Sequence, residues 1–99
     1  LPEVLRFNMS ADVKRHVELA IALGVEPKES DEATAVAGIE KIEAISKACG
    51  IPQHLTEIGI TEDVLSELAD IAMNVTRLLK NNPREVTKED AIAIYKKLL

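Results

Sequence analysis

The chain has 99 residues, of which 46% are hydrophobic and 29% charged, and this composition indicates an ordered globular protein of about one domain. The formal net charge is −5 and only Phe7 and Tyr95 are aromatic, so we expect neither a phosphate-binding surface nor a base-stacking platform, and no nucleic-acid partner. Cys49 is the only cysteine, which excludes an intramolecular disulfide.

Targeting and membrane signals are absent from the sequence as it stands. No apolar run approaches the roughly 20 residues that cross a bilayer, and no signal-peptide pattern occurs. We therefore predict a cytoplasmic protein with no membrane partner. The chain starts Leu1-Pro2-Glu3, without an initiator methionine, and we expect it to be a piece of a longer protein.

Helical signals follow one another from the start of the chain. We expect a short helix from Pro2 to about Asn8, then a second helix that Ser10 caps and Gly24 ends. The apolar side of this second helix is predicted to hold Val13, Val17, Ala20, Ile21 and Leu23. The polar segment 26–30 is typical of a mobile loop.

The third predicted helix is the longest of the first half and runs from Ser30 or Asp31 to Cys49. Its apolar residues recur at threes and fours, which is the helical period. They are Ala35, Val36, Ile39, Ile42, Ile45 and Cys49. Gly38 lies inside this helix, where glycine costs about 1 kcal/mol relative to alanine, so we expect it to allow another helix to approach closely.

The second half continues the helical pattern. Residues 51–60 predict one short helical turn and a link, after which Thr61 caps a helix. The apolar stripe of that helix is Val64, Leu65, Leu68, Ile71, Ala72, Val75, Leu78 and Leu79. The pair Asn82-Pro83 ends it, and Thr87 with Asp90 forms a capping box for the last helix. The predicted fold class is all-α: an irregular bundle of five or six helices with no sheet, in a single helical domain over residues 1–99.

The residues that could support chemistry are few and scattered. Asp12 and His16 lie four apart and could share a divalent metal, but two ligands are too few and a solvated helix face is the favoured interpretation. We interpret His54 as a surface histidine in a linker. Cys49 is interpreted as a buried structural thiol. The residues alone therefore predict a helical module without a catalytic, cofactor or metal site of its own.

Several short motifs occur in a recognisable order. They are Leu1-Pro2, Val4-Leu5, Phe7-Asn8, the third helix with Gly50-Ile51-Pro52, Leu55, Gly59-Ile60, Asn82-Pro83-Arg84-Glu85, Thr87 and Glu89-Asp90-Ala91-Ile92. In order and spacing they resemble the C-terminal portion of the iron-dependent (group III) alcohol dehydrogenase family, over essentially the whole chain. One departure is Glu3, which stands where that family often has a histidine.

The resemblance implies an enzyme about four times as long, with a nucleotide-binding α/β domain before this helical domain. Members of that family use NAD(P) and a divalent metal, usually iron, to interconvert alcohols and aldehydes or ketones. The metal acts as a Lewis acid on the reacting oxygen, and the nicotinamide exchanges hydride with the carbon. The metal ligands (one Asp and three His) and the dinucleotide-binding glycines lie upstream of the matching region. We therefore expect this chain to be a fragment that binds no cofactor or metal alone and is inactive in isolation.

The resemblance also implies a location for residues 78–81 and a partner for the chain. It places Leu78, Leu79, Lys80 and Asn81 on a wall of the substrate and nicotinamide cleft, whereas the alternative is that Leu78 and Leu79 only complete an apolar stripe. The expected partner is the remainder of the dehydrogenase. Exposed apolar surface is expected to drive formation of a homo-oligomer. The alternative hypothesis is a stand-alone helical protein-interaction module that binds a partner helix.

Overall fold

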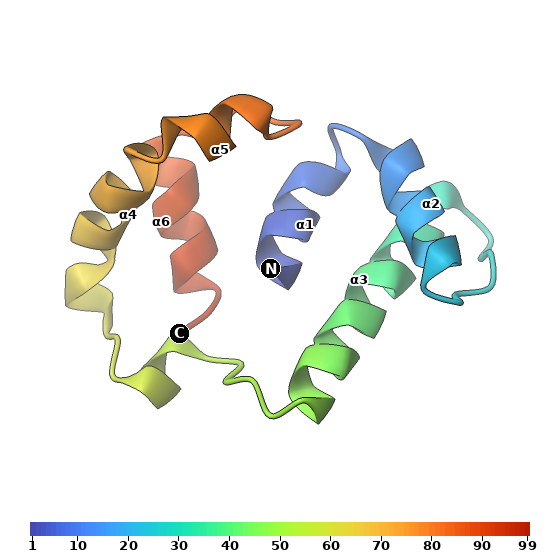
Figure 1. Cartoon of the computed structure of the whole chain (residues 1–99), viewed down its shortest axis with the longest axis horizontal. Helices are drawn as coiled ribbons and strands as arrows, with labels where there is room; N and C mark the ends of the chain where they lie inside the picture. The colour runs from blue at the N-terminus through green and yellow to red at the C-terminus, as the bar shows by residue number, and fades with distance from the viewer. The chain divides into compact units, whose positions relative to one another are not determined.

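The computed structural model describes all 99 residues, and it is helical throughout with no strand (Figure 1). The predicted all-α fold class is confirmed. The elements are α1 (Pro2–Met9), α2 (Val13–Ala22), α3 (Asp31–Ala48), the 3-10 helices η1 (Leu55–Ile58) and η2 (Glu62–Val64), α4 (Leu65–Met73), α5 (Thr76–Asn81) and α6 (Lys88–Lys96). No helix combines the length and the hydropathy needed to cross a membrane.

The chain divides into two compact units, which are Leu1–Ile51 (unit 1) and Pro52–Leu99 (unit 2). Each unit has buried residues of its own. That residues 1–99 form a single domain of a longer dehydrogenase stays a prediction.

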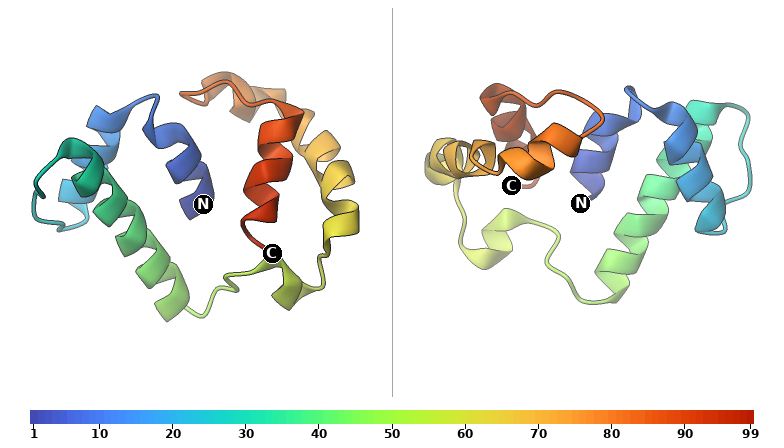
Figure 2. Two further views of the ribbon diagram at one scale, coloured as in Figure 1. Left: turned by 180° about the vertical axis from the view of Figure 1, so that it is seen from behind. Right: turned by 45° about the horizontal axis from the view of Figure 1, so that its top comes forward.

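Helix α3 is the centre of unit 1, and both α1 and α2 pack against it (Figures 1 and 2). The core is small and aliphatic, because Ala20 is 0% exposed and Ala35 and Ile39 are each 1% exposed. A β-carbon built on Gly38 would lie only 2.5 Å from the Ala20 β-carbon. Gly38 thus allows α2 and α3 to cross at very short range, as predicted.

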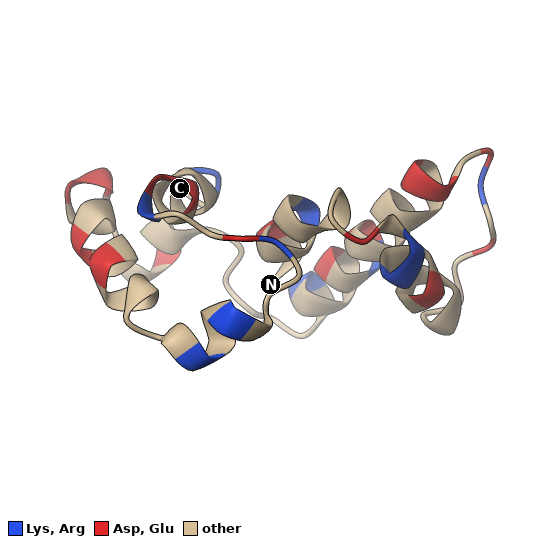
Figure 3. Ribbon diagram, turned by 90° about the horizontal axis from the view of Figure 1, so that it is seen from above, with Lys and Arg blue, Asp and Glu red and all other residues tan.

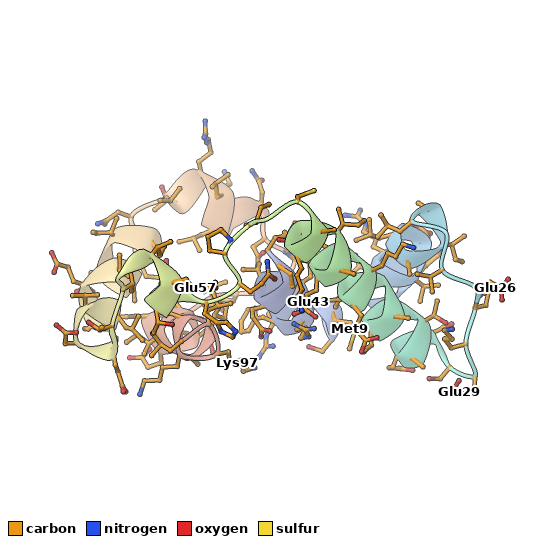
Figure 4. The ribbon with its side chains drawn as sticks, turned by 90° about the horizontal axis from the view of Figure 1, so that it is seen from below. Met9, Glu26, Glu29, Glu43, Glu57 and Lys97 are labelled. Carbon is orange, nitrogen blue, oxygen red and sulfur yellow. The ribbon has the colours of Figure 1, made fainter.

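The N-terminal caps of unit 1 differ in part from the prediction. Asp12, rather than Ser10, caps α2, because its carboxylate accepts a hydrogen bond of 3.2 Å from the Arg15 amide. Ser30 caps α3 as predicted and accepts from the Ala33 amide at 3.1 Å. Between these helices Gly24 has a φ of 87°, a left-handed conformation that favours glycine and ends α2. The loop that follows carries Glu26 and Glu29 away from the helices (Figure 4).

Only part of the predicted apolar stripe of α3 is buried. The buried residues all belong to its first half, from Thr34 to Ile39, whereas Ile45 is 46% exposed. The prediction that Cys49 is a buried thiol was wrong, because Cys49 is exposed at the end of the helix. The physical reason is that a stripe defines a face along the whole helix, whereas a neighbouring helix covers only the length that it crosses.

An ionic cluster joins α1 to α3 in unit 1. The Arg6 guanidinium donates two hydrogen bonds to the Glu43 carboxylate, at 3.0 and 2.6 Å, and one to Glu3 at 2.6 Å. The hydrogen bonds from Arg6 lower the pKa of Glu43 below its usual 4.5, against a smaller opposing effect of burial. The two side chains remain 32% and 40% exposed, so solvent screens the pair and its contribution to stability is at most about 1 kcal/mol.

This cluster leads to a pH-dependent prediction. A carboxyl group whose pKa is lower in the folded state stabilises that state above its unfolded pKa, and this contribution is lost as the pH falls through the folded pKa. We expect Glu43→Gln to lower the free energy of unfolding by up to about 1 kcal/mol at neutral pH. The difference from the unmodified chain should shrink as the pH falls below 4.5.

Urea unfolding of both chains across this pH range is the measurement. The matched control is Glu40→Gln, because Glu40 lies on the same helix, is exposed and takes part in none of the ion pairs. Equal effects of the two substitutions at neutral pH would show that the Arg6–Glu43 pair does not contribute.

Unit 2 is built on the packing of α4 against α6 (Figure 2). Leu65 and Ala69 of α4 and Ala91 of α6 are buried between them. Lys88 pairs with Asp70 at 2.7 Å and Lys96 with Glu62 at 3.1 Å. The two ends of the unit also meet, since the Leu55 amide donates to the Leu98 carbonyl at 2.7 Å and the Thr56 hydroxyl donates to the Leu99 carbonyl at 3.4 Å.

The single helix predicted after Thr61 is divided in the structure. It consists of η2, α4 and α5, and the break between α4 and α5 falls at Asn74 and Val75. Val75 has a ψ of 60°, outside the α-helical region, which turns the chain before α5. The short helical turn predicted within residues 51–60 is confirmed as η1.

Candidate functional site

The segment that joins α5 to α6 is held by local hydrogen bonds. Asn82, which precedes Pro83, is extended at φ −70° and ψ 137°, and its side-chain amide donates to the Arg84 carbonyl at 2.5 Å. The predicted capping box of α6 is confirmed: the Thr87 amide donates to the Asp90 carboxylate at 3.0 Å, and the Asp90 amide donates to the Thr87 hydroxyl at 3.1 Å. The hydrogen bond from the Thr87 amide lowers the pKa of Asp90.

The four residues predicted on the cleft wall all lie on α5. Leu78 is 61% exposed, Leu79 is half-buried, and Lys80 and Asn81 are exposed. The Asn81 side-chain amide donates back to the Arg77 carbonyl at 3.1 Å, which holds it along the helix. The predicted role of these residues stays a prediction, and their exposure is compatible with it.

Helix α5 is the basic part of unit 2. Arg77 and Lys80 lie three residues apart, and neither takes part in the ion pairs of the structure. Figure 3 shows the ribbon of α5 with basic positions and no acidic one. The chain as a whole has a net charge of −5, so this positive surface is a local departure from its overall charge.

The Asp12–His16 pair does not fit a divalent metal. His16 Nδ1 lies 2.8 Å from the backbone carbonyl of Asp12, and the Asp12 carboxylate lies 3.3 Å from Arg15 Nε. The expectation that His16 belongs to a solvated face was wrong, because it is only 7% exposed and its Nε2 is buried without a partner. No group of three or more His, Cys, Asp or Glu side chains could hold a metal ion.

The sequence contains a signal for the burial of His16, which is its spacing to Ala20. The i to i+4 spacing of His16 with Asp12 had favoured a different interpretation. His16 also lies four residues before Ala20, and residues at that spacing share a helix face. Ala20 is fully buried at the crossing with α3, so His16 lies on the same packed side. His54 is exposed, as expected for a linker, and its amide donates to the Glu57 carboxylate at 2.6 Å.

Comparison with known proteins gives a consistent result over the whole chain. Residues 1–99 match the model of the Fe-containing alcohol dehydrogenase family, C-terminal part. Lactaldehyde reductase of Escherichia coli K12 is 31% identical over 96% of this chain. The NAD-dependent methanol dehydrogenase of Bacillus methanolicus is 32% identical over 100% of it.

A solved structure agrees with these sequence matches. The crystal structure of a 1,3-propanediol oxidoreductase superposes with a TM-score of 0.87 at 28% identity, and the match covers 100% of this chain and 26% of the other. The chain likewise spans only 25% of the lactaldehyde reductase and 26% of the methanol dehydrogenase. It therefore corresponds to about a quarter of the length of its relatives.

Proposed function

Residues 1–99 belong to the C-terminal part of the Fe-containing alcohol dehydrogenase family, and we propose that they form the C-terminal helical part of a metal-dependent NAD(P) alcohol dehydrogenase. The observation that carries this proposal is the match of the family model to every residue of the chain. The relatives are named as enzymes that oxidise alcohols or reduce aldehydes, and one is named as NAD-dependent. In the longer protein the reaction would be the interconversion of an alcohol and an aldehyde.

We infer that the metal is held outside these residues, and that this chain contributes helical structure and part of the edge of the cleft. Asp12 and His16 are engaged with the backbone and Arg15, and no other grouping offers enough ligands. We infer that iron and the dinucleotide bind to the remainder of the polypeptide, and that the remainder is the principal partner of this chain. Leu78, Leu79, Lys80 and Asn81 would line the edge of the cleft, where their exposure on α5 leaves them able to contact substrate or nicotinamide.

Activity assays on two proteins test this proposal. The 99-residue chain, mixed with NAD(P)H, an aldehyde and Fe(II) or Zn(II), should give no oxidation of the nicotinamide above background. The longer protein that contains it should reduce the aldehyde under the same conditions. Aldehyde reduction by the isolated chain would contradict the assignment of the metal and dinucleotide sites to the remainder, and an inactive longer protein loaded with iron would contradict the proposed function.

We also infer that the isolated chain forms a homo-oligomer. Unit 1 exposes several large apolar side chains to solvent, including Leu1 at 75% and Ile21 at 51% exposure. Exposed apolar area of this kind favours association between molecules. Their association would remove this apolar area from water. Light scattering over a concentration series should show a mass above 10.8 kDa that rises with concentration, whereas a constant monomer mass would contradict the inference.

A further inference from the structure

Helix α5 is too short and too exposed to be stable by itself. It has only six residues, none of them buried, and it packs closely against no other element of unit 2. Isolated helices shorter than about 12–15 residues are marginal in water even when rich in alanine, because nucleation is costly. α5 also has no side-chain cap at its N-terminus. Its helical conformation therefore needs support that unit 2 does not provide.

The segment around α5 also has an unusual concentration of exposed apolar side chains. Ile71 is 57% exposed, Val75 is 42% exposed and Leu78 is 61% exposed. These three residues lie within eight positions and are three of the eleven large apolar residues that the whole chain exposes. Ile71 follows the buried Ala69 by two positions, or about 200° around the helix, so it lies on the side of α4 that faces away from α6.

We propose that this α4–α5 surface (Ile71, Val75 and Leu78, flanked by Arg77 and Lys80) docks onto the remainder of the dehydrogenase polypeptide, and that docking keeps α5 helical. The inference rests on the proposed function, because it takes the remainder of that enzyme as the occupant. Ile71 and Val75 would form the centre of the contact. Leu78 and the two cations would form its edge, on the side that borders the cleft proposed above.

Two arguments favour the remainder of the polypeptide over a second copy of the chain. About three quarters of the length of the relatives lies outside the matched region, and a covalently linked partner acts at an effective concentration of the order of millimolar. A two-fold contact between copies would instead place the same surface against itself. Arg77 and Lys80 of each copy would then face the cations of the other, without a carboxylate on α5 to neutralise them.

Hydrogen exchange of the α5 backbone amides measures directly how much docking stabilises this helix. The probes are the amides of Leu79 and Asn82, which donate to the carbonyls of Val75 and Leu79 at 3.2 and 3.1 Å. In the 99-residue chain at low concentration these amides should exchange at nearly unprotected rates. In the longer protein they should exchange on the order of tenfold more slowly or better. Circular dichroism of the isolated chain should show that its other helices are formed.

A matched pair of substitutions in the longer protein localises the contact. Ile71→Asp should return the exchange of the α5 amides toward the rate in the isolated chain, because it introduces a charge into the docked surface. Ile58→Asp is the control, since Ile58 is 59% exposed, also lies in unit 2 and stands outside the surface. Ile58→Asp should leave the α5 amides protected.

The outcomes separate docking from catalysis. Equal exchange of α5 in the two proteins, or an equal effect of Ile58→Asp, would overturn the proposal. Protection that grows with concentration in the isolated chain would also overturn it, in favour of a second copy. A longer protein that protects α5 but reduces no aldehyde would contradict the proposed function only, whereas an active one with an unprotected α5 would contradict docking only.

Discussion

Ile39→Ala should lower the free energy of unfolding by about 2–5 kcal/mol, which is the usual cost of truncating a fully buried aliphatic side chain to alanine. Ile39 is 1% exposed and is one of the two largest fully buried side chains in the molecule. It lies on α3, against which both α1 and α2 pack, so the cavity would open in the middle of unit 1. Urea or thermal unfolding followed by circular dichroism measures the loss.

The same type of substitution at an exposed position of helix α3 is the control. Ile45→Ala removes the same atoms from the same helix, but Ile45 is 46% exposed. Substitutions of this kind outside a core usually change stability by about 0.5 kcal/mol or less. If the two variants lost equal stability, the assignment of the unit 1 core to the first half of α3 would be refuted.

Gly38→Ala should destabilise the chain, although the same substitution in an exposed helix interior would stabilise it by about 1 kcal/mol through helix propensity. The added β-carbon would lie 2.5 Å from the Ala20 β-carbon and 2.8 Å from the Ala20 α-carbon. Relieving such a contact requires a backbone shift that typically costs about 1–3 kcal/mol. The predicted sign is therefore opposite to the one that local propensity gives, and unfolding by urea determines it.

A double-mutant cycle tests whether the clash with Ala20 is the cause. Adding Ala20→Gly removes the nearest of the contacting atoms and should recover part of the loss. The recovery should be incomplete, because the Ala20 α-carbon remains close and a second glycine weakens α2. A stabilising Gly38→Ala substitution would mean that α2 and α3 do not cross at this glycine.

Features that depend on neighbours along the chain were predictable from the sequence. The period of apolar residues, Ser30 and the capping box at Thr87 are local signals, and helices occur in every region where they were predicted, although the one predicted after Thr61 is divided into three. Gly38 could be interpreted as well, because a glycine within a helix carries an energetic cost that close packing explains. The family was identified from several motifs in order, and the match over residues 1–99 confirms it.

Features that depend on which elements pack together were not predictable in the same way. The exposure of Cys49 follows from where α2 and α1 cross α3, and no local pattern contains that information. For His16 the spacing to Ala20 is a local signal, but its meaning depends on the crossing of α2 with α3 at Ala20. The break at Val75 was missed because the apolar stripe continues across it in the sequence. The cleft-wall residues came from the family resemblance, since the other wall would lie in the remainder of the polypeptide.

The hydrogen bond from Leu55 to Leu98 has a consequence for protein engineering. The Leu55 nitrogen and the Leu98 carbonyl oxygen are 2.7 Å apart, although the two residues are separated by 43 positions in the sequence. The first and last parts of unit 2 are therefore in contact. Units whose ends lie together tolerate circular permutation and insertion into loops of other proteins. A short linker from Leu99 to Pro52, with new ends opened in the exposed Pro83–Glu85 turn, would join the two ends of the unit covalently and leave the α4–α6 packing intact.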